Sequence, residues 1–229
     1  MLEALRDEVL EANLELVRRG LVLYTFGNAS GIERSLGLVV IKPSGVPYDA
    51  MKPRDLVVVD LNGNLVEGNL RPSSDLPTHL ALYKAFPAIG GVVHTHSRSA
   101  TAWAQARREL PCFGTTHADY FHGTVPITEP LTREETQSDY EWNTGCSIVR
   151  RFANLDPLSM PAVLVAGHGP FAWGKSAREA AYHAAILEEV ARLAIETLAV
   201  NPEAAPLPDV LRDTHFFRKH GPGATYGQK

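Results

Sequence analysis

The pair Asn62-Gly63 is the sequence feature that most restricts how this chain can fold. It lies between two short apolar stretches, residues 56–60 and 65–68, and Asn-Gly is a strong signal for a two-residue turn in a β-hairpin. Strands joined by such a turn are antiparallel, whereas parallel strands need a long crossover connection. The sequence therefore predicts a sheet with antiparallel pairs and not a simple parallel Rossmann type.

Apolar periodicity predicts helices and further strands around this hairpin. Thr132 and Ser176 each have a glutamate three residues later, which is the capping-box pattern at the start of a helix. Asn143-Thr144-Gly145 is expected to end the helix that Thr132 caps. Helices are predicted over residues 2–19, 75–86, 99–109, 128–142 and 176–198, and strands over 38–41, 56–60, 65–68, 91–97 and 162–166.

Residues 27–31 read Gly-Asn-Ala-Ser-Gly, and two glycines with an asparagine are typical of a turn. Two interpretations of this turn stay open. It is a plain hairpin turn, or it is a loop whose backbone amides and Asn28 side chain hold an anion or a substrate hydroxyl.

Composition limits the number of domains and the class of partner. With 229 residues, of which 45% are hydrophobic and 21% charged, the chain suits one well-cored domain. The formal net charge of -4 argues against a general nucleic-acid binder. There is no apolar run of about 18 residues and no signal-peptide pattern, and Cys112 and Cys146 form no Cys-x-x-Cys unit. A cytosolic protein with no membrane partner is expected.

His94 and His96 are candidate metal ligands. They follow an apolar pair in a predicted strand, where residues at i and i+2 leave the same face. A structural or surface pair of histidines is the alternative interpretation. Asp75 and His168 lie in segments that are predicted to turn, and three imidazoles with one carboxylate suit a divalent cation such as zinc.

Two small polar segments are candidate anion sites. Lys42-Pro43-Ser44-Gly45 follows a predicted strand and offers a cation with short hydrogen-bond donors. Ser73 and Ser74 precede a predicted helix, and a helix N-terminus favours anions. The alternative is that Ser73, Ser74 and Asp75 only cap that helix.

Two later segments carry titratable side chains. Residues 111–123 include His117, Asp119, Tyr120 and His122, a candidate acid/base region, although any one of them could be a surface or capping group. The proline-rich tail, residues 202–229, is either a frayed terminus or a segment that closes over a site.

Seven short motifs occur in order along essentially the whole chain. They are Gly27-Asn28-Ala29-Ser30-Gly31, Lys42-Pro43-Ser44-Gly45, Ser73-Ser74-Asp75, His94-Thr95-His96-Ser97, Gly114-Thr115-Thr116-His117-Ala118-Asp119, Gly167-His168-Gly169-Pro170-Phe171, and Arg218-Lys219-His220-Gly221 with Tyr226-Gly227-Gln228. This ordered set resembles the L-ribulose-5-phosphate 4-epimerase family of the class II aldolase superfamily. The resemblance implies one three-layer α/β/α domain over residues 1–229 with a largely antiparallel central sheet, in which the tail 202–229 closes over the site. It also implies a homotetramer with metal sites between neighbouring subunits.

Carried over residue by residue, the resemblance implies that zinc, or else manganese or cobalt, binds Asp75, His94, His96 and His168. It implies that Asp119 and Tyr226 form an acid/base pair that approaches from the adjacent subunit. The implied substrate contacts are Gly27, Asn28, Lys42, Ser44, Gly45, Ser73, Ser74, Thr115, His215 and Arg218.

The implied reaction is interconversion of L-ribulose 5-phosphate and D-xylulose 5-phosphate by retro-aldol cleavage and re-addition, in arabinose or ascorbate breakdown. Asp75 and the Asp119 motif favour the epimerases over the related fuculose-phosphate aldolases, which carry Glu at the position of Asp75. Thr225 departs from the family, whose members often have a second tyrosine there. The alternatives are an aldolase or dehydratase for another sugar phosphate, and a non-enzymatic domain like the adducin head.

Overall fold

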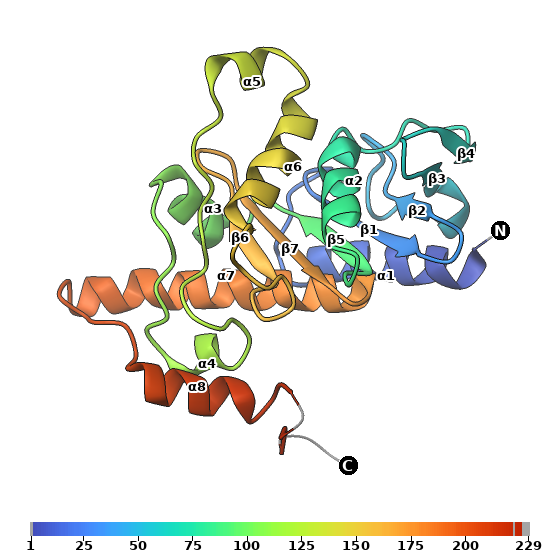
Figure 1. The fold of residues 1–229 in the computed structure, drawn as a ribbon. Coiled ribbons are helices and arrows are strands. Elements are labelled where there is room, and N and C mark those ends of the chain that lie inside the picture. The colour runs from blue at the N-terminus through green and yellow to red at the C-terminus, as the bar shows by residue number, and fades with distance from the viewer. Residues whose placement is uncertain (1, 222, 226–229) are drawn as a thin grey trace.

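The computed structural model describes residues 2–221 and 223–225, which form a central seven-stranded sheet with helices on both faces (Figure 1). The strand order is β4-β3-β2-β1-β5-β7-β6, and every neighbouring pair is antiparallel. The strands are β1 (Asn28–Glu33), β2 (Leu38–Ile41), β3 (Val57–Asp60), β4 (Leu65–Glu67), β5 (Gly91–His94), β6 (Ala162–Leu164) and β7 (Pro170–Gly174). The antiparallel hairpin predicted at Asn62-Gly63 is confirmed, since it joins β3 to β4.

The helices pack against this sheet or against one another. They are α1 (Glu3–Arg18), α2 (Leu76–Ala85), α3 (Arg98–Gln105), α4 (Thr115–Ala118), α5 (Arg133–Gln137), α6 (Tyr140–Arg151), α7 (Ala177–Val200) and α8 (Asp209–Phe217), with a short 3₁₀ turn at Pro53–Asp55. Ser176 caps α7 as predicted, because its Oγ accepts a hydrogen bond from the Glu179 amide. In the described residues, no helix is both long and apolar enough to cross a membrane.

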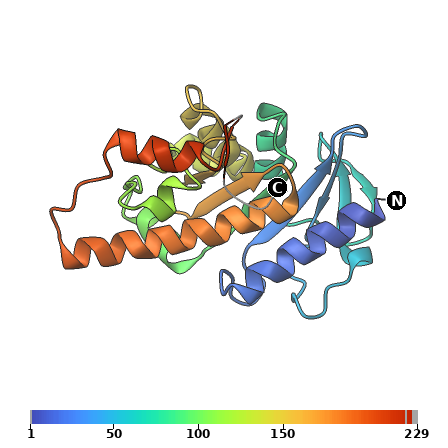
Figure 2. The same cartoon turned by 90° about the horizontal axis from the view of Figure 1, so that it is seen from below.

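Alternating residues of β1 show that helices cover opposite faces of the sheet. A Cβ atom at Gly31 would lie 2.8 Å from Leu5 and 2.9 Å from Val9, so this face of β1 packs closely against α1. Ser30 points to the other face, where its Oγ lies 2.7 Å from Nδ1 of His79 in α2. Figure 2 shows the blue α1 and the orange α7 on the same side of the sheet. The predicted three-layer α/β/α fold with a largely antiparallel sheet is confirmed.

The prediction of a turn over residues 27–31 is wrong for most of that segment. Residues 28–33 form β1, which pairs with both β2 and β5 in the middle of the sheet. Small residues there are poor strand formers in isolation, but two neighbouring strands satisfy the backbone hydrogen bonds and α1 needs the close approach at Gly31. Tertiary packing has therefore overridden local propensity.

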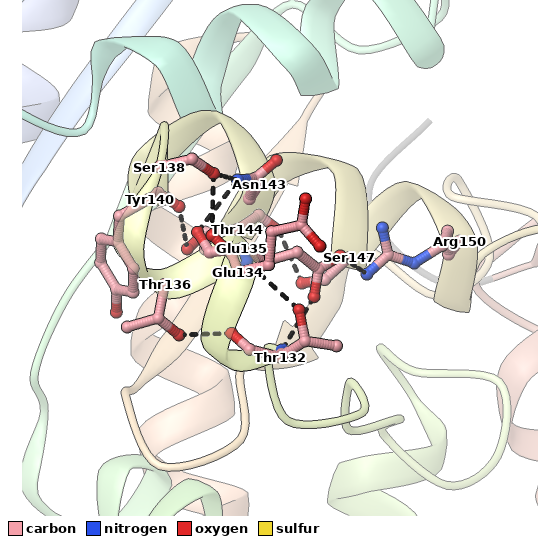
Figure 3. Close-up of polar contacts among 10 residues, drawn as sticks. All are labelled: Thr132, Glu134, Glu135, Thr136, Ser138, Tyr140, Asn143, Thr144, Ser147 and Arg150. Atoms are coloured by element: carbon pink, nitrogen blue, oxygen red, sulfur yellow. Dashed lines mark hydrogen bonds and ion pairs between the residues drawn. The ribbon is translucent and has the colours of Figure 1, made fainter.

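The prediction that Asn143-Thr144-Gly145 ends a helix is also wrong. Thr132 caps α5 with the predicted capping box, but α5 ends at Gln137 and α6 runs on through residues 143–145 (Figure 3). The Asn143 side chain donates hydrogen bonds to the Glu135 carbonyl oxygen and to Ser138 Oγ, which ties α6 back to α5. Gly145 faces α2, where an added Cβ would lie 2.5 Å from Cβ of Ala81. The glycine thus permits close packing of two helices.

Several boundaries differ from the predictions. The strand predicted over 91–97 ends at His94, and the strand predicted over 162–166 ends at Leu164. β7 was not predicted, because it begins at a proline and ends at a glycine. The tail is not simply frayed, since α8 forms within it and packs against α4 (Figure 1).

Candidate metal and substrate site

Three histidine side chains converge beside the central strands. His94 ends β5, His96 follows it by two residues, and His168 lies in the turn between β6 and β7. Antiparallel pairing of β5 with β7 sets His94 opposite Phe171 and brings this turn beside it. One ring nitrogen from each histidine lies within 4.8 Å of the others, so these three residues, the histidine cluster, could hold one divalent ion.

Hydrogen bonds orient two rings of the histidine cluster. Nδ1 of His94 lies 3.0 Å from the Pro170 carbonyl oxygen, which can only accept, so Nδ1 carries the proton and Nε2 keeps its lone pair. Nδ1 of His168 lies 3.1 Å from the Tyr140 hydroxyl. Such partners on the remote ring nitrogen are typical of metal-binding histidines.

The imidazoles of His94 and His168 favour the neutral form that metal binding requires. Burial, followed by the neighbouring His94 and His96, lowers the pKa of His168 to about 4. Burial also lowers the pKa of His94. Two of the three rings therefore offer unprotonated nitrogens near neutral pH, and the donor set fits a borderline cation.

Asp75 lies at the N-terminus of α2, but its side chain makes no capping hydrogen bond. Its Oδ2 instead accepts a hydrogen bond of 2.6 Å from Nδ2 of Asn28. Burial alone would raise the pKa of Asp75, yet the neighbouring His94 and His79 side chains and the Asn28 hydrogen bond outweigh it and lower the pKa. The carboxylate is ionised and lines the same cavity as the histidine cluster, although it is outside the group of atoms within 4.8 Å.

A buried polar seam joins β1 to α2. Asn28 and Ser30 alternate along one face of the strand, and Asp75, His79 and Tyr83 recur every four residues along one face of the helix. Asn28 bonds Asp75, while Ser30 Oγ lies 2.7 Å from His79 Nδ1 and 2.8 Å from the Tyr83 hydroxyl. The seam fixes how α2 is rotated against the sheet, and so where the Asp75 carboxylate points.

A second set of polar residues lines the cavity of about 480 Å³ that contains the histidine cluster. Lys42 is almost completely buried there, and burial lowers its pKa. We call this set the lysine–serine group; it comprises Lys42, Ser44, Gly45, Ser73 and Ser74. Serine hydroxyls and an ammonium group are donors suited to a phosphate.

Asp119 belongs to a separate group between α4 and α8. Both of its carboxylate oxygens lie 3.0 Å from Nη2 of Arg218, and Lys219 Nζ and His215 Nδ1 lie 3.1 Å from the carboxylate. Burial would raise the pKa of Asp119, but hydrogen bonds from Arg218, Lys219 and His215 outweigh it and lower the pKa. The side chain is therefore a carboxylate near neutral pH.

Comparison with known proteins decides the family. Residues 7–195 match the model of the family described as the Class II Aldolase and Adducin N-terminal domain. The chain belongs to this family. It is 54% identical over 228 residues, 100% of each chain, to proteins named L-ribulose-5-phosphate 4-epimerase UlaF from Salmonella paratyphi B and Salmonella typhi. The resemblance to the L-ribulose-5-phosphate 4-epimerases is thus confirmed.

Solved structures of an aldolase and of a putative aldolase share the fold. An L-fuculose 1-phosphate aldolase superimposes with a TM-score of 0.80 at 28% identity, covering 94% of this chain and 95% of that one. YgbL from Klebsiella pneumoniae, described as a putative aldolase/epimerase/decarboxylase, gives a TM-score of 0.72 at 29% identity, covering 93% and 99%.

The class II aldolase fold brings together most, but not all, of the predicted site residues. One cavity is lined by Gly27, Asn28, Lys42, Ser44, Gly45, Ser73, Ser74, Asp75, His94, His96 and His168. In the described part of one chain, Thr115, Asp119, His215 and Arg218 do not line this cavity, and they gather at α4 and α8 instead. Tyr226 lies outside the described residues.

Several side chains in and behind the cavity wall were not predicted as site residues, and Phe26 is one of them. Tyr140 and Glu141 also line the cavity, His79 belongs to the seam below Asp75, and Tyr48 packs beneath Lys42. The spacing of His79 four residues after Asp75 is the one signal that could have shown a shared helix face. No local pattern marks Tyr48 or Tyr140, because each reaches the site only through the tertiary fold.

Proposed function

We propose that this protein interconverts L-ribulose 5-phosphate and D-xylulose 5-phosphate. The main observation in support is that the histidine cluster and the lysine–serine group line one cavity of about 480 Å³. A metal-binding set and a phosphate-binding set in the same cavity suit a phosphorylated sugar. The relatives named L-ribulose-5-phosphate 4-epimerase, at 54% identity over the whole chain, support this substrate in particular.

The reaction explains why two such sets are needed. The proton on C4 of a 2-ketose is not acidic, so C4 cannot be inverted by simple enolisation. A base instead removes the proton of the C4 hydroxyl, and the C3–C4 bond breaks to give the enediolate of dihydroxyacetone and glycolaldehyde phosphate. The aldehyde rotates and is attacked on its other face, and an acid returns a proton to the new C4 oxygen. Ser44, Ser73 and Ser74 would hold the phosphate throughout, so the short fragment does not escape.

Zinc is the proposed cofactor, with manganese or cobalt as alternatives. His94, His96 and His168 would hold it, with Asp75 as the fourth ligand, and its Lewis acidity would stabilise negative charge on the ketose oxygens. Because Nδ1 of His94 donates its proton to the Pro170 carbonyl oxygen, Nε2 keeps a lone pair that could bind the metal. Asn28 holds the Asp75 carboxylate in the same cavity.

Asp119 and Tyr226 are the proposed proton carriers. Asp119 lies outside the cavity of its own chain, which is consistent with an approach from a neighbouring subunit in a homotetramer. Arg218, Lys219 and His215 hold it as a carboxylate, the form that accepts a proton. Thr115, His215 and Arg218 would then meet the substrate with it, and the tail, residues 202–229, would close over the site. A cytosolic location suits an enzyme of phosphorylated sugars.

A class II aldolase acting on another sugar phosphate is the second candidate, because L-fuculose 1-phosphate aldolase shares this fold. Asp75, where the aldolases carry Glu, favours the epimerase. A non-enzymatic role like that of adducin is less well supported, since the histidine cluster and Asp75 have no use in a simple binding domain.

Incubation with L-ribulose 5-phosphate separates these candidates. The epimerase is expected to form D-xylulose 5-phosphate with no net release of glycolaldehyde phosphate, as followed by ¹³C NMR. Net release of the aldehyde would support an aldolase and overturn the epimerase. No turnover of L-ribulose 5-phosphate by the zinc-loaded protein would overturn the epimerase, and cleavage of L-fuculose 1-phosphate instead would support the aldolase.

A further inference from the structure

Lys42 carries a buried ammonium group, and its partners among the described residues bear no full negative charge. Only 2% of the residue is exposed. Its Nζ donates a hydrogen bond of 3.2 Å to the Pro43 carbonyl oxygen and lies 4.8 Å from the centre of the Tyr48 ring. A buried cation in such surroundings favours an anionic ligand, and the face of an aromatic ring helps to keep it charged.

Tyr48 makes a second set of contacts with its hydroxyl. The hydroxyl oxygen lies 2.8 Å from the Phe26 carbonyl oxygen and 2.9 Å from that of Gly27, so its single proton is shared between them. Phe26 and Gly27 both line the cavity, while Tyr48 is buried behind it. The ring and the hydroxyl of one residue therefore support two different parts of the wall.

Phe26 and Gly27, whose carbonyl oxygens contact the Tyr48 hydroxyl, lie next to the proposed metal ligands. Gly27 precedes Asn28, whose side-chain Nδ2 donates hydrogen bonds to Asp75 Oδ2 and Ser73 Oγ. The Phe26 ring packs beside the His96 ring, with 6.4 Å between their centres. Tyr48 thus connects Lys42 of the lysine–serine group with residues that contact the proposed metal ligands.

We infer that Tyr48 is a positioning residue that fixes the lysine–serine group relative to the histidine cluster. The inference rests on the proposed function, because retro-aldol cleavage leaves an aldehyde anchored only through its phosphate. That aldehyde must return to bonding distance of the other fragment, and small errors in placement cost a large part of the rate. The Tyr48 ring positions the Lys42 ammonium group, which would contact the phosphate. The Tyr48 hydroxyl positions Phe26 and Gly27, which lie beside the metal ligands.

Two substitutions separate these roles. Tyr48→Phe keeps the ring but removes the hydroxyl, and is expected to lower kcat about tenfold. Its affinity for inorganic phosphate, used as a competitive inhibitor, is expected to stay within about twofold of the wild-type value. Tyr48→Leu removes both contacts, and is expected to weaken phosphate binding about tenfold as well. Zinc content, measured by elemental analysis, should stay the same in both.

Ser147→Ala is the control, since it removes another buried hydroxyl, 2.7 Å from the Thr144 carbonyl oxygen in α6, away from the lysine–serine group. It is expected to lower the unfolding temperature as the Tyr48 variants do, with unchanged phosphate binding. Wild-type kcat in Tyr48→Phe, or wild-type phosphate binding in Tyr48→Leu, would overturn the inference. So would equal losses of phosphate binding in Tyr48→Leu and Ser147→Ala, which would indicate a general structural role.

Calorimetry with inorganic phosphate keeps this test independent of the reaction. If wild type fails to turn over L-ribulose 5-phosphate, the proposed function fails. Weaker phosphate binding in Tyr48→Leu than in Tyr48→Phe would still support the role of the ring, and equal binding in the two variants would still overturn it.

Discussion

The side-chain nitrogen Nδ2 of Asn28 lies 2.6 Å from carboxylate oxygen Oδ2 of Asp75. Asn28 begins β1, and Asp75 immediately precedes α2, so this hydrogen bond joins the sheet to the start of a helix. A carboxylate at that position would ordinarily cap the helix. Here the asparagine directs it toward the cavity of the histidine cluster.

Asn28→Ala is therefore expected to weaken metal binding. Loss of an outer partner of a metal site typically costs about 10-fold to 100-fold in affinity, because the ligand is no longer held in place. Competition for zinc with a coloured chelator measures the change. Asn64→Ala is the matched control, since Asn64 donates a similar hydrogen bond to Asp60 in the exposed β3–β4 turn. Equal zinc affinity in the two variants would contradict the role given to Asn28.

His96→Asn should remove metal and activity together, because it takes one of three imidazoles from the cluster. Zinc content and turnover of L-ribulose 5-phosphate are measured on the same sample. His122→Asn is the control, since His122 pairs with Asp213 away from the cavity. Full activity in a preparation freed of metal would show that the histidine cluster has another purpose.

Asp119→Asn and Tyr226→Phe are each expected to lower kcat by about 100-fold or more with zinc content unchanged, the scale of loss typical of a removed acid or base. Asp119→Asn also weakens the attachment of α8, because Arg218, Lys219 and His215 lose their anionic partner. Elemental analysis alongside kinetics provides the check. If either variant lost zinc, the substituted residue would not be a proton carrier.

Gly145→Ala is expected to destabilise the protein by about 1–3 kcal/mol, although alanine favours helices, because the added methyl group overpacks the α2–α6 contact. Urea unfolding measures the free energy. Gly114→Ala is the control, since an added Cβ there meets no atom within 4 Å, and its effect should stay within about 0.5 kcal/mol. Similar losses in both variants would mean that the helix contact adjusts easily.

His117 should make stability depend on pH. Burial lowers its folded-state pKa to about 4, below the value of 6.5 expected when unfolded, so the unfolded chain binds more protons between these values. Stability should therefore fall as pH drops from 6.5 toward 4, by up to about 1.4 kcal/mol per pH unit from this residue. In urea unfolding, the stability gap between wild type and His117→Gln should shrink over this range. A constant gap would exclude the effect.

Local signals predicted the elements that carry their own pattern. The amphipathic α1, the β3–β4 hairpin at Asn62-Gly63 and the capped starts of α5 and α7 all follow from neighbouring residues. The motifs also contain most of the residues that line the cavity, from Gly27 to His168.

Local sequence patterns could not predict the elements whose conformation depends on contacts between residues far apart in the chain. β1 is a strand because β2 and β5 flank it, and its small residues suit the close approach of α1 at Gly31. α6 continues through Gly145 because α2 packs there. The contact between Tyr48 and Lys42 joins a turn to a strand end, and no periodicity in the sequence reports it.

The place of β5 in the sheet has a consequence for synthesis of the chain on the ribosome. β5 pairs with β1, made earlier, and with β7, made much later. Until residues 170–174 emerge, Val92 and Val93 leave one strand edge open, and such edges favour association between chains. Nascent chains stalled after α3 should therefore bind chaperones more strongly than chains stalled after α7.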